Sequence, residues 1–129
     1  MSEPVPADAA PADSDLPGPA DPAAWLTLPD VAERLDLSIS KVHQLIRDRE
    51  LLAFRRDGVR RVPADLVANP TVRKHLPGVI HLLTDAGYDD EAMLRWLYEA
   101  DDTLSGTPAA ALGGHQAREV KRRAQALGF

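Results

Sequence analysis

The segment RRDGVRR, residues 55–61, gathers arginines on one short stretch of a 129-residue chain. Its basic side chains are Arg55, Arg56, Arg60 and Arg61. A guanidinium carries several N–H donors in one plane, and this geometry suits the oxygens of phosphate groups. The whole chain has a formal net charge of -5, so the positive charge is local. Arginines clustered in this way predict a surface that binds a polyanion.

The centre of this segment predicts a tight β-hairpin. Asp57-Gly58 is a preferred pair for a type I′ turn between two strands. We expect the strands over residues 51–54 and 59–62. Together with the turn they form a small wing, which covers residues 53–62.

The register of this hairpin places like charges side by side. With only two residues in the loop, Arg55 lies opposite Arg60, and Phe54 lies opposite Arg61. A like-charged pair destabilises a hairpin by roughly a few tenths of a kcal/mol or more unless an anion is bound there. The arrangement therefore favours a wing that holds phosphates.

A second group of hydrogen-bond donors lies on a predicted helix over residues 39–49. An apolar stripe at Val42, Leu45 and Ile46 faces inward. The N-cap and the outward side chains are polar or basic, namely Ser38, Ser40, Lys41, His43, Gln44 and Arg47. Such groups can bind base edges and phosphates in a major groove. A solvated helix face has the same composition, so this helix alone leaves both interpretations open.

Another helix, over residues 28–35, precedes this one. Thr27 is a suitable N-cap, Pro29 falls in the first turn, and apolar side chains recur at helical spacing. Residues 36–38 separate the two helices, a spacing that is typical of a helix-turn-helix. A helix-turn-helix followed by a basic hairpin predicts a winged helix-turn-helix. In that fold the second helix enters the major groove of double-stranded DNA and the wing holds the backbone.

The rest of the chain predicts further helices. We expect one over residues 76–86, which Gly87 ends, and another that Asp89 caps. Residues 101–114 predict a loop, in which the alanines can form a short helical turn, and a last helix covers residues 115–127. Its basic face supplies candidate auxiliary DNA contacts at Arg118, Lys121 and Arg122. The predicted fold class is mainly α with a small β-hairpin, a winged helix-turn-helix followed by a C-terminal helical subdomain.

Composition divides the chain into three parts. Residues 1–24 are rich in Pro, Ala and Asp and contain no Lys or Arg, so we expect a disordered acidic tail. Ser14 in this tail is a candidate phosphorylation site. Residues 25–68 form the winged helix-turn-helix, and residues 69–129 form a helical region packed on it.

Several kinds of chemistry lack support in the sequence. The chain has no cysteine, which excludes disulfides and thiolate sites, and its four histidines fall in no metal-site pattern. No phosphate-binding glycine loop, nucleophile elbow or dinucleotide motif occurs. We therefore predict no enzyme activity, no metal and no cofactor. We also find no leader and no membrane-spanning run, and expect a cytoplasmic protein associated with the nucleoid.

Residues 27–63, TLPDVAERLDLSISKVHQLIRDRELLAFRRDGVRRVP, resemble the winged helix-turn-helix of the excisionase and mercury-resistance-regulator superfamily. Such domains commonly have Leu-Gly-Val-Ser in the turn. Here Asp36 stands at the glycine position, and aspartate tolerates the same left-handed conformation. The segments LPGVIHLLTDAGYDDEAMLRWLY and GHQAREVKRRAQALGF look like the C-terminal part of a small actinobacterial family of winged helix-turn-helix DNA-binding proteins.

The resemblance implies roles for both polar surfaces. It places the polar side chains of residues 38–47 on a recognition helix and the arginines of residues 55–61 on the wing. Such a family is also associated with Ser/Thr kinase signalling, so a kinase acting on the tail is an implied partner. The tail has no threonine, and its hydroxyl acceptors are Ser2 and Ser14.

Two alternatives to a DNA-binding regulator stay open. A protein-interaction adaptor would use the helical C-terminal region and would have little or no DNA binding. It would expose an apolar patch at Leu94, Trp96 and Tyr98, whereas the favoured interpretation places these side chains in the core. A homodimer through the middle and last helices is the other alternative, although no sustained heptad occurs.

Overall fold

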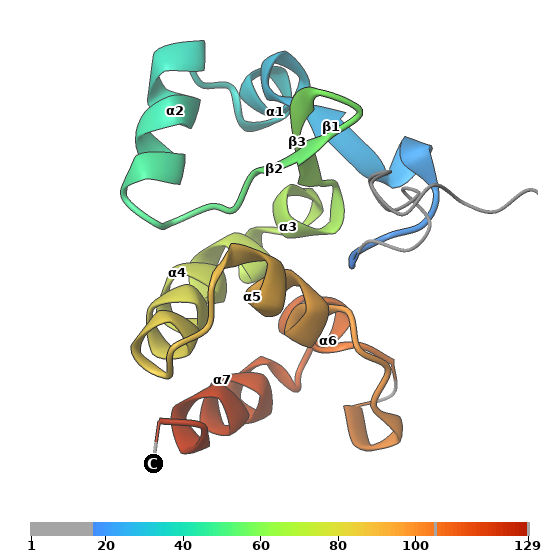
Figure 1. The fold of residues 1–129 in the computed structure, drawn as a ribbon, viewed down its shortest axis with the longest axis vertical. Helices are drawn as coiled ribbons and strands as arrows, with labels where there is room; N and C mark the ends of the chain where they lie inside the picture. Colours follow the sequence, from blue (N-terminus) through green and yellow to red (C-terminus); the bar gives the residue numbers. More distant parts are fainter. Residues whose placement is uncertain (1–16, 105, 129) are drawn as a thin grey trace, which may run out of the picture.

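The computed structural model describes residues 17–104 and 106–128, which form two parts stacked along the long axis (Figure 1). The elements follow in chain order as β1 (Trp25–Thr27), α1 (Leu28–Leu35), α2 (Ile39–Arg47), β2 (Phe54–Arg56), β3 (Val59–Pro63), α3 (Asp65–Ala68), α4 (Pro70–Asp85), α5 (Asp90–Leu97), α6 (Pro108–Leu112) and α7 (Ala117–Ala126). Helices α1 and α2 and the strands form one part, α4 to α7 form the other, and α3 lies between them. The predicted fold class, a winged helix-turn-helix followed by a helical region, is confirmed.

The helix-turn-helix begins and turns where the sequence predicts. The Thr27 hydroxyl caps α1 by accepting a backbone hydrogen bond of 3.3 Å, and the Ser38 hydroxyl caps α2 in the same way at 3.1 Å. Between the helices Asp36 is left-handed, with a φ of 56°. Helix α2 ends at Arg47, earlier than the predicted residue 49. Arg49 has a φ of 62°, a left-handed conformation that a continuing helix does not allow.

The wing belongs to a three-stranded antiparallel sheet in the order β1-β3-β2. We did not predict β1, because a strand of three residues is too short to show a two-residue alternation. The prediction of a strand over residues 51–54 is wrong except at its last residue, since β2 covers Phe54–Arg56. Leu51 and Leu52 lie in the connection from α2 and are buried. Burial in the core, not strand pairing, therefore explains this apolar run.

The hairpin itself has the predicted register. Arg55 lies opposite Arg60, and Phe54 lies opposite Arg61. Asp57 and the glycine after it have φ angles of 55° and 78°, and positive φ at both central positions is what a type I′ turn requires. The two arginines therefore face each other across the wing as expected.

Helix α4 is longer than predicted, because it begins at Pro70 instead of residue 76. The Asn69 side chain accepts a hydrogen bond from the Thr71 amide at 2.7 Å and so caps the helix. Pro70 occupies the first turn, where a missing N–H loses no helical hydrogen bond. The Asn-Pro pair thus starts a helix, and Pro77 lies inside it.

The Asn69 cap gives a test of this helix start. Asn69→Ala removes the cap and also a hydrogen bond of 3.3 Å to the Gly113 carbonyl, so we expect the free energy of unfolding to fall by about 0.5–2 kcal/mol. Urea denaturation measures this change. Asn69→Asp keeps the acceptor and should lose less, whereas an unchanged free energy for Asn69→Ala would contradict the capping role.

The remaining helices lie close to their predicted positions. Asp89 caps α5 with a hydrogen bond of 2.8 Å, and Gly87 before it has a φ of 95°. Helix α7 lies within the predicted residues 115–127. The predicted loop over residues 101–114 contains the short helix α6, which Thr107 caps. Local capping signals therefore place the starts of α1, α2 and α5 correctly.

One hydrophobic core joins the two parts, with Val42 of α2, Leu66 of α3 and Leu94 of α5 all fully buried. Trp96 and Tyr98 are half-buried. The exposed patch that the adaptor alternative predicts at Leu94, Trp96 and Tyr98 is therefore wrong, because α5 packs into the core. Among the described residues, no helix has the length and apolar character needed to cross a membrane.

Candidate nucleic-acid interface

Helix α2 presents its predicted polar face to solvent. Most of the predicted side chains are exposed, namely Ser38, Ser40, Lys41, Gln44 and Arg47. His43 is half-buried, and Val42 on the opposite face has no exposed surface. Within residues 17–104 and 106–128, no carboxylate lies at ion-pair distance from Lys41 or Arg47. Both side chains are thus available to an external anion.

The tip of the wing carries two exposed arginines. Arg55 and Arg60 face each other across the hairpin, and neither forms an ion pair with a described residue. One guanidinium nitrogen of Arg55 donates to the Gly58 carbonyl at 2.9 Å, which holds this side chain over the turn. The wing therefore presents two cationic groups side by side, and no acid of the described residues pairs with either of them.

Arg56 differs from these two, because it is only 7% exposed. Side chains alternate along a strand, so Arg56 shares the inner face of β2 with Phe54 while Arg55 points away. Its guanidinium lies 5.0 Å from the ring centroid of Trp25 and donates to the Glu91 carboxylate at 3.2 and 3.4 Å. We therefore do not propose that Arg56 contacts phosphate, because its guanidinium is paired with Glu91 and its side chain is buried.

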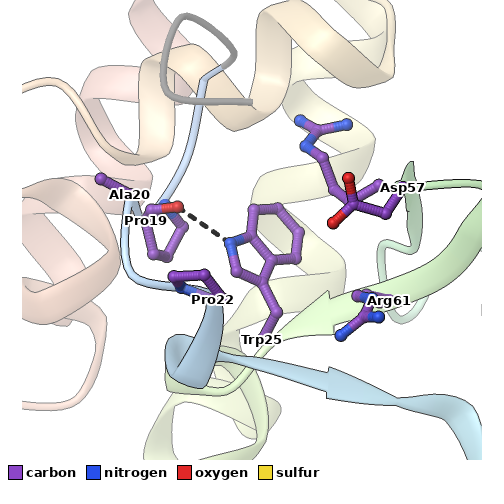
Figure 2. A pocket seen from close by; sticks show the side chains of 7 residues that line it. Pro19, Ala20, Pro22, Trp25, Asp57 and Arg61 are labelled. Carbon is purple, nitrogen blue, oxygen red and sulfur yellow. Dashed lines mark hydrogen bonds between the residues drawn. The ribbon is translucent and has the colours of Figure 1, made fainter. Parts of the chain in front are cut away.

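Arg61 lies on the same inner face and is half-buried. It lines a hollow of about 40 Å³ together with Trp25, Pro19 and Asp57. Figure 2 shows Trp25 at the centre of this hollow, where its indole N–H donates to the Pro19 carbonyl at 2.9 Å. The Nε atom of Arg61 is buried and has no hydrogen-bond partner among the described residues. Only the outer part of its guanidinium can reach a ligand.

The start of α2 and the tip of the wing share one hollow of about 330 Å³, which is lined by Thr27, Leu28, Pro29, Ile39, His43, Val59 and Arg60. Ile39 and Val59 are 42% and 43% exposed, which is unusual for large apolar side chains. Neither residue is among the site residues predicted from the sequence. Ile39 lies outside the inward apolar stripe of its helix, so the helical spacing of the sequence already indicates an exposed isoleucine.

The predicted auxiliary contacts on α7 are exposed but lie elsewhere. They are Arg118, Lys121 and Arg122. Helix α7 lies at the opposite end of the long axis from α2 and the wing (Figure 1), and Arg122 is paired with Glu119 at 2.8 Å. The structure thus does not bring these residues together with the wing. The candidate phosphorylation site Ser14 lies outside the described residues.

No cluster of three or more His, Asp or Glu side chains within the described residues could hold a metal ion. The surface made by α2 and the wing tip instead offers exposed hydroxyl, amide, lysine and arginine donors beside two apolar side chains. Such a set can bind phosphate oxygens, base edges and a methyl group. Its chemistry is that of non-covalent recognition.

One known protein is similar to this chain over nearly its whole length, and a second is similar over a third of it. The chain is 40% identical over 132 residues to the DNA-binding protein Rv2175c of Mycobacterium tuberculosis (strain ATCC 25618 / H37Rv), covering 92% of this chain and 89% of that protein. It is 52% identical over 42 residues to an excisionase of Streptomyces ambofaciens, covering 33% of this chain and 68% of the excisionase. The NMR structure of Rv2175c matches with 34% identity and a TM-score of 0.74, and all of both chains is covered.

Two family descriptions match consecutive parts of the chain. Residues 9–67 match the family described as "DNA-binding protein Rv2175c, wHTH domain". Residues 73–128 match the family described as "Rv2175c C-terminal domain of unknown function". With these two domains in the same order, and with the relative and the solved structure that span it, the chain belongs to the Rv2175c family of winged helix-turn-helix proteins.

Proposed function

We propose that this protein binds double-stranded DNA and regulates transcription, with α2 in the major groove and the wing tip on the phosphate backbone. The observation that carries the proposal is the facing pair of exposed arginines, Arg55 and Arg60, which have no acidic partner among the described residues. Two like charges held side by side are stabilised when an anion neutralises them. A phosphate backbone supplies such anions at regular spacing.

The donors of α2 suit the groove beside that backbone. Lys41 and Arg47 are exposed cations for flanking phosphates, and Ser40, His43 and Gln44 are hydrogen-bond donors or acceptors for base edges. The names of the matched family and of the similar mycobacterial protein, both called DNA-binding, support this proposal. Arg61 adds a partial phosphate contact, because its guanidinium is half-buried.

Ile39 gives this surface an apolar contact for a base. It is exposed at the first position of α2, where recognition helices meet the groove, and the C5 methyl of thymine is the apolar group displayed there. We expect deoxyuridine in place of one thymine of the bound site to weaken binding about fourfold, the equivalent of one apolar carbon at about 0.8 kcal/mol. Ile39→Ala should bind both duplexes equally, as measured by fluorescence anisotropy. If deoxyuridine at every thymine position left the affinity of the parent unchanged, Ile39 would not contact a thymine methyl group.

Selection from a random duplex library, followed by binding measurements over a range of salt concentrations, tests the proposal. A regulator should enrich a defined motif, and its affinity should fall steeply with salt, with a slope of log K against log salt of about −0.9 for each phosphate contact. A protein that enriched no motif would be a non-specific DNA binder, and one that retarded no duplex at moderate salt would not be a DNA-binding protein.

Further features of this regulator stay predictions. Phosphorylation of Ser14 by a Ser/Thr kinase and homodimerisation through the C-terminal helices are compatible with DNA binding but are not needed for it. Contacts from Arg118, Lys121 and Arg122 would require DNA that extends to the far end of the molecule. A cytoplasmic location at the nucleoid follows from the proposed ligand.

A further inference from the structure

Two consecutive acids of α5 hold two arginines of the winged helix-turn-helix. Arg49 donates to Asp90 at 2.7 Å, and Arg56 donates to Glu91 at 3.2 Å. A third contact lies at the other end of the same helix, where the Tyr98 hydroxyl donates to Asp65 of α3 at 3.1 Å. Burial is the main reason that the pKa of Tyr98 is raised, so the phenol stays neutral and remains a donor. Helix α5 thus contacts the winged helix-turn-helix at its start and α3 at its end.

The two arginines are placed next to the two DNA-facing elements. Arg49 follows the end of α2, and Arg56 is the last residue of β2, directly before the turn of the wing. The acids that hold them, Asp90 and Glu91, lie in the first turn of one short helix. Consecutive residues of a helical turn have fixed positions relative to each other. These two ion pairs therefore connect both the end of α2 and the wing to the first turn of α5.

Several contacts hold the guanidinium of Arg56. Its guanidinium lies 5.0 Å from the Trp25 ring centroid and 5.7 Å from that of Phe54, and it also donates to the Pro17 carbonyl at 3.3 Å. Its side chain is 8% exposed, whereas that of Glu91 is 50% exposed. An arginine so enclosed has little freedom, so the strand that carries it has a defined position relative to α5.

The chain before β1 completes this enclosure. Gly18 packs so closely that a Cβ atom there would lie 2.9 Å from a ring carbon of Trp25 and 3.1 Å from a methyl group of Leu94. Its φ of 98° also favours glycine. Figure 2 shows Pro19, Ala20 and Pro22 of this segment beside the Trp25 side chain, on the side away from Arg61. The wing, the segment before β1 and α5 therefore meet at one point.

We propose that α5 positions the wing relative to α2, and that this is a function of the C-terminal domain in DNA binding. Asp90 and Glu91 are positioning residues, because they act through Arg49 and Arg56 and do not themselves contact DNA. The inference rests on the proposed DNA binding. Repulsion between Arg55 and Arg60 favours opening of the free hairpin, and the anchored Arg56 on the same strand opposes it.

The direction in which the affinity for DNA changes distinguishes a positioning role of the two acids from a purely electrostatic one. Replacing Asp90 with Asn or Glu91 with Gln removes a negative charge from a protein whose formal net charge is -5. Electrostatic attraction alone would then increase the affinity for DNA. If the acids position the wing, the affinity falls instead, because the arginines at the wing tip no longer meet the phosphates together with α2.

The experiment compares Asp90→Asn/Glu91→Gln with a matched control, Glu99→Gln, an exposed acid just beyond α5. In the double variant we expect the slope of log K against log salt to flatten by about one to two units, as if wing contacts had been removed. Amide hydrogen exchange of residues 54–61 in the free protein should be about tenfold faster. The control should bind DNA as tightly as the parent or more tightly. Arg56→Lys, which keeps the charge but loses the planar fork, should behave like the double variant.

Three outcomes decide between the possibilities. If the double variant keeps the parent's salt slope and affinity while the parent binds DNA, the positioning role is wrong and the proposed function stands. If the parent binds no DNA, the proposed function fails, and hydrogen exchange still reports whether α5 holds the wing. Unchanged exchange of residues 54–61 in both the double variant and Arg56→Lys would overturn the inference directly.

Discussion

Replacing Arg55 and Arg60 together with alanine is expected to weaken DNA binding by about thirtyfold in 0.15 M salt. This figure follows from two lost phosphate contacts, each with a salt slope of about −0.9, if the counterion contribution vanishes near 1 M salt. The slope of log K against log salt should flatten by about two units. Both side chains are exposed and neither has an acidic partner among the described residues, so the replacement breaks no described ion pair.

The conservative variant Arg55→Lys/Arg60→Lys provides the matched control. Lysine keeps the point charge and should therefore keep most of the salt slope, although the bidentate geometry is lost. Arg95→Ala, which removes one exposed arginine from α5, measures the effect of losing a single positive charge outside the wing. Anisotropy titrations at several salt concentrations measure all three variants. If the double alanine variant bound as the parent does at every salt concentration, the wing would not contact DNA.

Leu94→Ala is expected to lower the free energy of unfolding by about 2–5 kcal/mol, the range for deleting a fully buried leucine side chain. Leu94 has no exposed surface and belongs to the core that joins the two parts of the fold. The cavity left behind would lie next to Gly18, which has no side chain to fill it. Urea denaturation monitored by circular dichroism measures the loss.

This experiment also separates a core role for α5 from an adaptor role. Leu127→Ala is the matched control, because Leu127 is 39% exposed, and its effect should stay within about 0.5 kcal/mol. A surface used for partner binding would tolerate Leu94→Ala without loss of stability. Equal stability of the two leucine variants would therefore show that α5 does not pack as described.

The helix-turn-helix could be predicted from the sequence because its signals are local. The hydroxyls of Thr27 and Ser38 cap helices that begin immediately after them, and Asp36 takes the left-handed conformation in the turn. The hairpin register likewise follows from the Asp57-Gly58 pair alone. The start of α4 was missed although Asn69 and Pro70 are also local signals. An Asn-Pro pair favours both a turn and a capped helix start, and here the helical arrangement prevails.

The position of Arg56 could be predicted only in part. The alternation of side chains along β2 separates it from Arg55, but an inner face of a two-stranded wing can be open to solvent. It is covered here because Trp25 comes from a strand that the sequence did not reveal, and because Glu91 comes from a helix 35 residues further along the chain. The run of arginines alone does not show this difference.

Local sequence sets the caps of α1, α2 and α5, the turn, and the pairing of Arg55 with Arg60, since these depend on hydrogen bonds and backbone preferences within a few residues. The packing of distant segments sets which arginines of RRDGVRR have no acidic partner among the described residues. That outcome depends on burial and on charges brought together from distant parts of the chain, so it is set when α5 packs against the wing. The cluster therefore divides into Arg55 and Arg60 at the exposed tip, Arg61 partly covered, and Arg56 as an anchor.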